Sequence, residues 1–298
     1  MDVRNIQKTG KMFYIYLPTK WCRKNNVTSA SQANLELNND GSLTVYPCPR
    51  KKKPKSIVFN ISKEEQDVTD KLMIACYINP LESFKIEFGE GVNLKRLLRQ
   101  KKSLRSLEFV EFTEDHLTCE SYVSVENPLT LLRNMVRKIS NLVQVMRDRY
   151  DAELIARYED EIDKSKILVS KAVVNSLTFH SITNLKPIDL HYTSIISRSL
   201  EMLVDYLTFV DKTETKFFDI VAGTLEDLKE IVARLGGDTC DIDYRGALRF
   251  AKRVTAMKMV RVVDLNTYDQ RRVRRCLIDI SEMLIDWSVT ERVTRSDS

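Results

Sequence analysis

The residues best suited to chemistry in this chain are two pairs of carboxylates with helical spacing. Glu159 and Asp163 are four residues apart, and Glu201 and Asp205 repeat that spacing further along the chain. Residues four apart share one face of a helix, where like charges repel unless water, a basic neighbour or a bound cation compensates. Two such pairs on adjacent helices would offer oxygen ligands to a metal ion.

The second pair has an alternative interpretation. It belongs to the only polar stripe in an apolar segment, which is typical of the solvent face of a helix, and the stripe comprises Ser194, Ser197, Arg198, Glu201, Asp205 and Thr208. Arg198 is also placed to neutralise part of the Glu201 charge. Spacing alone leaves the metal site and the solvent face both open.

Other catalytic patterns are missing from the sequence. It contains no Ser-His-Asp spacing, no phosphate-cradling glycine loop and no nucleotide fingerprint, so an enzyme would have no evident nucleophile or base. His116, next to Asp115, has no evident partner and indicates a surface histidine. We therefore expect a protein that is not an enzyme.

Helical periodicity dominates the C-terminal part, residues 127–298. Breaks fall near Pro187, Gly236 and Asn266, and the predicted helices span residues 128–149, 152–178, 188–210, 215–235, 244–262 and 269–292. Six helices joined by short loops predict a bundle, or two three-helix bundles in series.

Positive charge is concentrated at the other end of the chain. Residues 1–55 hold eleven Lys and Arg residues against three acids, although the whole chain of 298 residues carries a formal net charge of only +5. A short basic segment of this kind is typical of a module that binds polyanions, because neutralised phosphates release their counterions. The alternative is a basic face that only contacts water.

The pattern of elements in residues 1–49 predicts two hairpins around a short helix. Residues 3–8 and 11–17 flank a Thr9-Gly10 turn, residues 18–25 suit a short helix, and residues 34–37 and 42–46 flank an Asp40-Gly41 turn. This order resembles the swapped-hairpin DNA-binding domain of the AbrB and SpoVT group. The resemblance implies that the cations of the first strands and the helix face DNA: Arg4, Lys8, Lys11, Lys20, Arg23 and Lys24.

Size argues independently for a homodimer. A unit of about fifty residues with four short strands and one short helix would bury little core alone. Both faces of the predicted second strand are apolar, with Met12, Tyr14 and Tyr16 on one and Phe13, Ile15 and Leu17 on the other. A partner that covers the strand would bury both faces, so we interpret these side chains as core and not as base-stacking residues.

Two further segments connect the hairpin region, residues 1–49, to the helical part, residues 127–298. Residues 50–55 read as a basic linker that also suits contact with phosphate, and residues 56–126 alternate strand and helix patterns, which predicts a small α/β module. In archaeal proteins that this chain resembles, similar α/β segments lie between the hairpin domain and the helical bundle. The sequence does not reveal the role of this module.

The helical part resembles the PhoU family of phosphate uptake regulators. The segments that carry the resemblance are residues 151–163, with the run Glu159-Asp160-Glu161-Ile162-Asp163, and residues 197–206, with Glu201 and Asp205. The resemblance implies an iron- or zinc-type metal ion on these four carboxylates. Two positions depart from the family pattern, because Met202 stands where the family has arginine and Tyr206 where it has histidine. A second repeat is weaker, and its last helix offers either Glu282 with Asp286 or a shifted match in which Arg275 replaces the acid.

Composition fits a cytoplasmic protein. The six cysteines lie far apart without a C-x-x-C pair, so a disulfide framework or a zinc knuckle is not expected. No apolar run reaches the ~20 residues that a membrane span needs.

These observations predict a multidomain α+β regulator. The first hypothesis is a homodimeric, double-stranded-DNA-binding transcription regulator of phosphate uptake or phosphate homeostasis. The alternative is an adaptor similar to PhoU that acts on a phosphate transporter or sensor kinase, with the hairpins serving only to dimerise.

Overall fold

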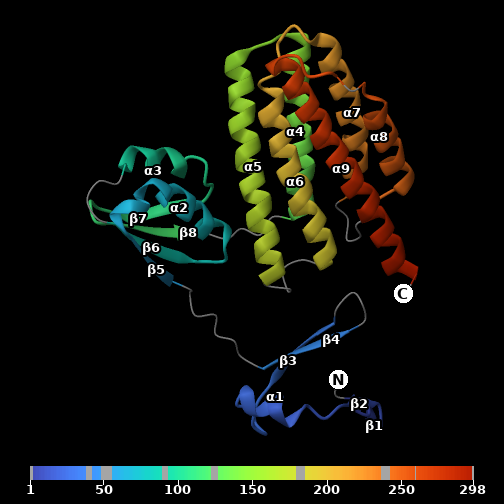
Figure 1. Cartoon of the computed structure of the whole chain (residues 1–298). Coiled ribbons are helices and arrows are strands. Elements are labelled where there is room, and N and C mark those ends of the chain that lie inside the picture. Colours follow the sequence, from blue (N-terminus) through green and yellow to red (C-terminus); the bar gives the residue numbers. More distant parts are fainter. Residues whose placement is uncertain are drawn as a thin grey trace. The chain divides into compact units, whose positions relative to one another are not determined.

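A computed structural model divides the chain into two compact units, residues 1–53 and 54–298 (Figure 1). It describes residues 3–37, 42–47, 56–88, 93–121, 127–178, 185–235, 242–258 and 260–296. The division falls within the predicted basic linker, residues 50–55, all of which lies outside the described residues together with the Asp40-Gly41 turn.

The first unit consists of two antiparallel hairpins with a short helix between them. Strands β1 (Gln7–Thr9) and β2 (Met12–Tyr14) pair so that Lys8 faces Phe13, and Gly10 takes a positive φ of 63° in the turn. Helix α1 (Thr19–Lys24) follows, and strands β3 (Ala33–Leu37) and β4 (Leu43–Pro47) form the second hairpin. The predicted order of elements is confirmed, but β2 is shorter than the predicted residues 11–17.

Helix α1 ends for a local reason. The backbone N–H of Asn25 donates to the Trp21 carbonyl, and Asn26 adopts a left-handed φ of 52°. Asparagine tolerates this conformation better than most residues and often ends a helix there.

The described part of the first unit has no buried side chain. Its apolar residues are largely exposed: Met12, Phe13, Tyr14, Ile15 and Tyr16 around β2, and Leu35, Leu37 and Leu43 in the second hairpin. Exposed apolar surface on this scale opposes the stability of an isolated small unit.

The second unit begins with a four-stranded sheet. Strand β5 (Ser56–Ile61) runs parallel to β6 (Ser83–Phe88), and β8 (His116–Ser121) lies antiparallel between β6 and β7 (Leu107–Phe112). A 3-10 turn, η1 (Lys63–Val68), and helix α2 (Thr69–Ile78) connect the two parallel strands. The Ser62 backbone N–H donates to a Glu65 carboxylate oxygen at 3.0 Å, a capping contact at the start of η1.

One face of this sheet carries the core of the module. Alternate residues of β6 and β8 are buried, among them Phe84, Ile86, Leu117 and Cys119, and they pack with Met73 of α2. Helix α3 (Leu94–Lys101) also contributes to this core and lies on the same face of the sheet as α2 (Figure 1). Period-two burial is the expected signature of a sheet covered on one side.

Six long helices complete the second unit. They are α4 (Pro128–Asp148), α5 (Ala152–Thr178), α6 (Pro187–Leu207), α7 (Thr215–Ala233), α8 (Tyr244–Ala256) and α9 (Leu265–Ser296). Most of their buried apolar residues form one hydrophobic cluster that includes Leu132, Leu200, Phe218, Phe250 and Trp287, and a smaller cluster includes Val169 and Leu190.

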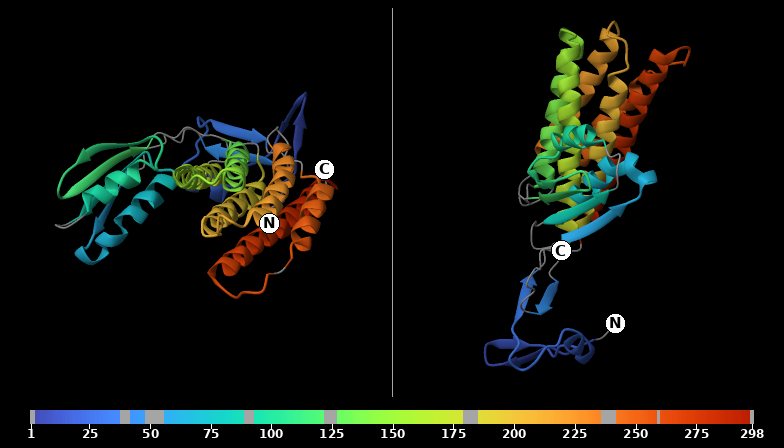
Figure 2. Two further views of the ribbon diagram at one scale, coloured as in Figure 1. Left: turned by 90° about the horizontal axis from the view of Figure 1, so that it is seen from above. Right: turned by 90° about the vertical axis from the view of Figure 1, so that its left-hand side faces the viewer.

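The helices pack side by side around this core (Figures 1 and 2). Helices α4 and α6 both pack against α5, helices α7 and α9 both pack against α8, and the pairs α4–α7 and α6–α9 join the two sets. The predicted arrangement was a bundle or two bundles in series, and the shared core corresponds to the first alternative.

Two helix ends differ from their predicted positions because of capping and tertiary contacts. Helix α9 begins at Leu265, since the Asp264 carboxylate accepts a hydrogen bond from the Thr267 N–H at 2.8 Å. Helix α8 ends at Ala256 instead of residue 262, and Met257 turns away from helical geometry with its side chain buried. The Met257 carbonyl then accepts a hydrogen bond from Arg274 Nε at 3.0 Å.

None of the helices that the structure describes is both long enough and apolar enough to span a membrane.

Candidate functional site

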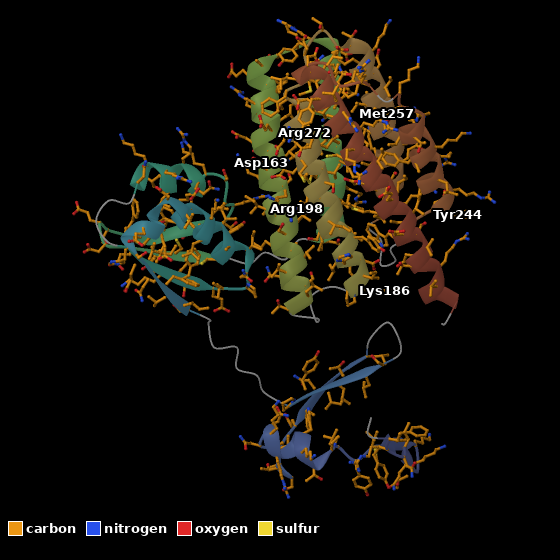
Figure 3. All side chains as sticks on the ribbon, viewed as in Figure 1. Asp163, Lys186, Arg198, Tyr244, Met257 and Arg272 are labelled. Atoms are coloured by element: carbon orange, nitrogen blue, oxygen red, sulfur yellow. The ribbon has the colours of Figure 1, made fainter. Side chains whose placement is uncertain are left out.

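The fold brings the four predicted carboxylates together. Glu159 and Asp163 lie on α5, Glu201 and Asp205 lie on α6, and these two helices pack against each other. Figure 3 labels Asp163 on α5. We refer to Glu159, Asp163, Glu201 and Asp205 as the acidic cluster.

Loss of hydration and mutual repulsion raise the pKa values of three carboxyls in the acidic cluster, Glu159, Asp163 and Asp205. Loss of hydration is the largest cause for Asp163, followed by the charges of Glu201, Asp205 and Glu159, and together they raise the pKa of its carboxyl to about 6. The pKa values of Glu159 and Asp205 are raised for the same two reasons. Asp163 nevertheless remains exposed, so the cluster is accessible to solvent.

Two cations offset part of this negative charge. Lys166 Nζ lies 3.3 Å from Glu201 Oε1, and the guanidinium of Arg272 on α9 partly opposes the rise in the pKa of Asp205. Arg272 is held by stacking over the Tyr206 ring, 3.5 Å from its centre. The prediction that Arg198 neutralises Glu201 is wrong, because Arg198 is exposed and pairs with no carboxylate that the structure describes.

As they stand, the carboxylates do not form a metal-ligand set. Within the described ranges, no three Asp, Glu, His or Cys side chains are grouped closely enough to hold an ion. Lys166 also takes an oxygen of Glu201 that a metal would need. The polar stripe on α6 is not a plain solvent face either, since Ser197 is buried and Glu201 and Asp205 are half-buried.

The weaker second repeat supplies no comparable cluster. Glu282 and Asp286 on α9 are both exposed. The neighbouring Arg275 pairs instead with Asp279, at 2.9 Å.

The six predicted DNA-contacting cations of the first unit are all exposed: Arg4, Lys8, Lys11, Lys20, Arg23 and Lys24. Lys8 lies over the Phe13 ring across the first hairpin. Lys11, Lys20, Arg23 and Lys24 form no ion pair with any residue that the structure describes. Such cations are available to a polyanion at no cost in broken salt bridges.

Sequence reasoning missed a buried lysine in the second unit. Lys171 on α5 is only 5% exposed and donates a hydrogen bond to Ser121 Oγ at 2.6 Å. The one signal in the sequence was the spacing, because Lys171 follows the apolar Ile167 by four residues and so shares its helix face.

His116 also differs from its prediction as a surface histidine without a partner. Its Nε2 lies 2.9 Å from a carboxylate oxygen of Glu111, and its Nδ1 lies 3.0 Å from Thr113 Oγ1. These contacts tie the β7–β8 hairpin together and indicate a structural role.

The chain matches none of the protein-family models, curated proteins or solved structures with which it was compared.

Proposed function

We propose that this protein is a homodimeric DNA-binding regulator without enzymatic activity, in which the first unit of each copy contributes to one shared hairpin domain. The observation that carries the proposal is the combination of exposed apolar residues and exposed cations in that unit.

The apolar residues support the homodimer. Phe13 is 69% exposed, and residues on both faces of β2 are open to water. A second copy whose hairpins interleave with these would bury both faces at once, and burial of apolar area stabilises by about 25 cal/mol per Å². The proposed swapped-hairpin arrangement supplies such a cover.

The cations support DNA as the ligand. Lys11, Lys20, Arg23 and Lys24 are exposed and unpaired among the described residues of a unit that is rich in basic side chains. Contacts to phosphate position such a protein on DNA, and they make its affinity depend steeply on salt. The proposed connection to phosphate uptake rests on the resemblance of the helical region to the PhoU family.

The experiment is a titration of the full-length chain with random-sequence duplex DNA at several salt concentrations. Binding at low salt, with a steep loss of affinity as salt rises, is the expected result. Absence of binding at low salt would reject the proposal and favour the adaptor, in which the hairpins only hold two copies together.

A metal ion on the acidic cluster remains a separate proposal. Loss of hydration and, second, the charges of neighbouring carboxylates raise the pKa values of Glu159, Asp163 and Asp205, and the remaining repulsion favours a cation there. An ion would have to displace Lys166 from Glu201, which makes Lys166 the residue to change in a test.

A further inference from the structure

A cavity of about 540 Å³ opens in the helical region, away from the acidic cluster. It lies between α7, the end of α8 and the first turns of α9. Figure 3 labels Met257, which lies in its wall just after α8. Cavities of roughly 300 to 1,000 Å³ are typical of sites for small molecules.

Apolar side chains form much of the lining. Phe217 and Ile220 come from α7, Ala256 and Met257 come from the end of α8, and Val260 follows. Phe217 is half-buried and Met257 is buried, so both present a fixed apolar surface to the cavity. An aromatic or aliphatic body would lose its contact with water here.

Cations surround this lining. Lys216, Arg253, Lys258, Arg271 and Arg274 line the cavity, whereas Asp219 is its only carboxylate among the residues that the structure describes. Two of these cations are already engaged, because Arg253 Nε lies 2.6 Å from Asp227 Oδ2 and Arg274 donates to the Met257 carbonyl.

The other three cations are available to a ligand. Lys216, Lys258 and Arg271 are exposed, and none of them forms an ion pair with a residue inside the described ranges. Three available cations and one carboxylate favour an anionic head group on whatever binds.

Gln270 supplies an independent observation. It lines the cavity and is only 6% exposed, yet its carboxamide forms no hydrogen bond with the residues that the structure describes. No polar atom of Gln270 belongs to the fully buried, unpartnered side-chain atoms of the described residues, so the carboxamide is open to the cavity and can bond to a ligand there. A ligand head group in the cavity would complete the hydrogen bonding of Gln270.

We infer that this cavity binds a small organic anion with an apolar body and one anionic head group. The body lies against Phe217 and Met257, and the head lies near Gln270 and Arg271. The inference goes beyond the proposed DNA binding and does not depend on it. Inorganic phosphate would leave the apolar lining in contact with water, and an uncharged ring would leave the cations unmatched.

Three probes test the inference on the full-length chain by calorimetric titration: 1-naphthyl phosphate, inorganic phosphate and 1-naphthol. Saturable binding of one 1-naphthyl phosphate per chain is expected, about tenfold or more tighter than either other probe. The inference is overturned if 1-naphthyl phosphate does not bind, or if inorganic phosphate or 1-naphthol binds equally well.

Variants assign the binding to this cavity. Gln270→Leu keeps the volume of the side chain but removes its hydrogen bonds, Arg271→Ala removes an available cation, and Ala256→Trp fills the cavity from an exposed position. Each should weaken 1-naphthyl phosphate binding about tenfold or more. Lys252→Ala removes an exposed cation of α8 outside the cavity and should bind like the unmodified chain. Equal affinity in all four variants would place the probe elsewhere and overturn the assignment.

Discussion

The ammonium group of Lys171 lies 3.7 Å from the centre of the Tyr77 ring, which connects helix α5 of the bundle to helix α2 of the α/β module. Lys171 also donates to Ser121 at the end of β8. The Tyr77 hydroxyl in turn donates to the Arg105 carbonyl at 2.6 Å. The buried ammonium group of Lys171 therefore contacts two elements of the α/β module, helix α2 and strand β8.

This lysine predicts a stability that rises in alkaline solution. Burial lowers the pKa of Lys171 from 10.5 to about 8, so between these values the unfolded chain binds a proton that the folded chain has lost. Stability increases with pH wherever the unfolded state binds more protons, and this shift corresponds to a gain of about 3 kcal/mol by pH 10.5. Urea unfolding from pH 7 to 10.5 measures it.

Lys171→Met isolates this contribution. The variant should lose the rise in unfolding free energy above pH 8 relative to the unmodified chain, whereas Lys252→Met, at an exposed position, should keep it. Identical pH profiles for Lys171→Met and the unmodified chain would refute the assignment.

Dimerisation should depend on the apolar surface of the first unit. Phe13→Asp is expected to convert the dimer into a monomer, because a carboxylate would be buried without a partner in the shared core. Sedimentation equilibrium of the full-length chain measures the change. Phe209→Asp is the matched control, since Phe209 is 68% exposed against 69% for Phe13 but belongs to the second unit.

A monomeric unmodified chain, or a Phe13→Asp variant that still dimerises, would contradict the proposed interleaved hairpins. Loss of the dimer in both variants would instead indicate an interface in the helical region.

DNA affinity should depend on helix α1. Charge reversal at Lys20, Arg23 and Lys24 is expected to lower affinity for duplex DNA by roughly a hundredfold or more at low salt and to flatten its salt dependence. Fluorescence anisotropy with labelled duplex measures both. The control reverses Lys95, Arg99 and Lys102, which are exposed at and just after α3 and change the net charge equally.

If the two triple variants lose affinity to the same extent, binding follows net charge and not the first unit. That outcome would remove the assignment of DNA contacts to α1.

One substitution beside the acidic cluster should lower the stability of the chain and raise its affinity for a metal ion. Lys166→Met removes the partner of Glu201, so it should lower the unfolding free energy by about 1 kcal/mol and raise the affinity for Zn²⁺. Thermal unfolding and a zinc titration measure the two effects. In the double variant Lys166→Met with Asp163→Asn, the zinc affinity should fall again.

If Lys166→Met destabilises the chain without any zinc binding, the cluster is an ion-pair network and not a metal site.

Several features of this chain follow from the sequence alone. Local chemistry defined most of the helices and strands, because hydrophobic periodicity and capping residues act over only a few positions of the chain. At the start of α8, for example, the Asp243 carboxylate accepts a hydrogen bond from the Arg245 N–H at 3.0 Å. Helical spacing also placed Glu159 with Asp163 and Glu201 with Asp205, and the structure brings the two pairs together. Charge counting identified the basic N-terminal segment.

Tertiary structure decided what those side chains meet. The pairing of Glu201 with Lys166 in place of Arg198, the burial of Lys171 against Tyr77 and the position of Gln270 in the cavity wall depend on contacts between residues far apart in the sequence. A one-dimensional pattern shows on which face of a helix a residue lies, but not which helix covers that face. Only packing sets the desolvation and the neighbouring charges that give a carboxylate, a lysine or an amide its chemistry.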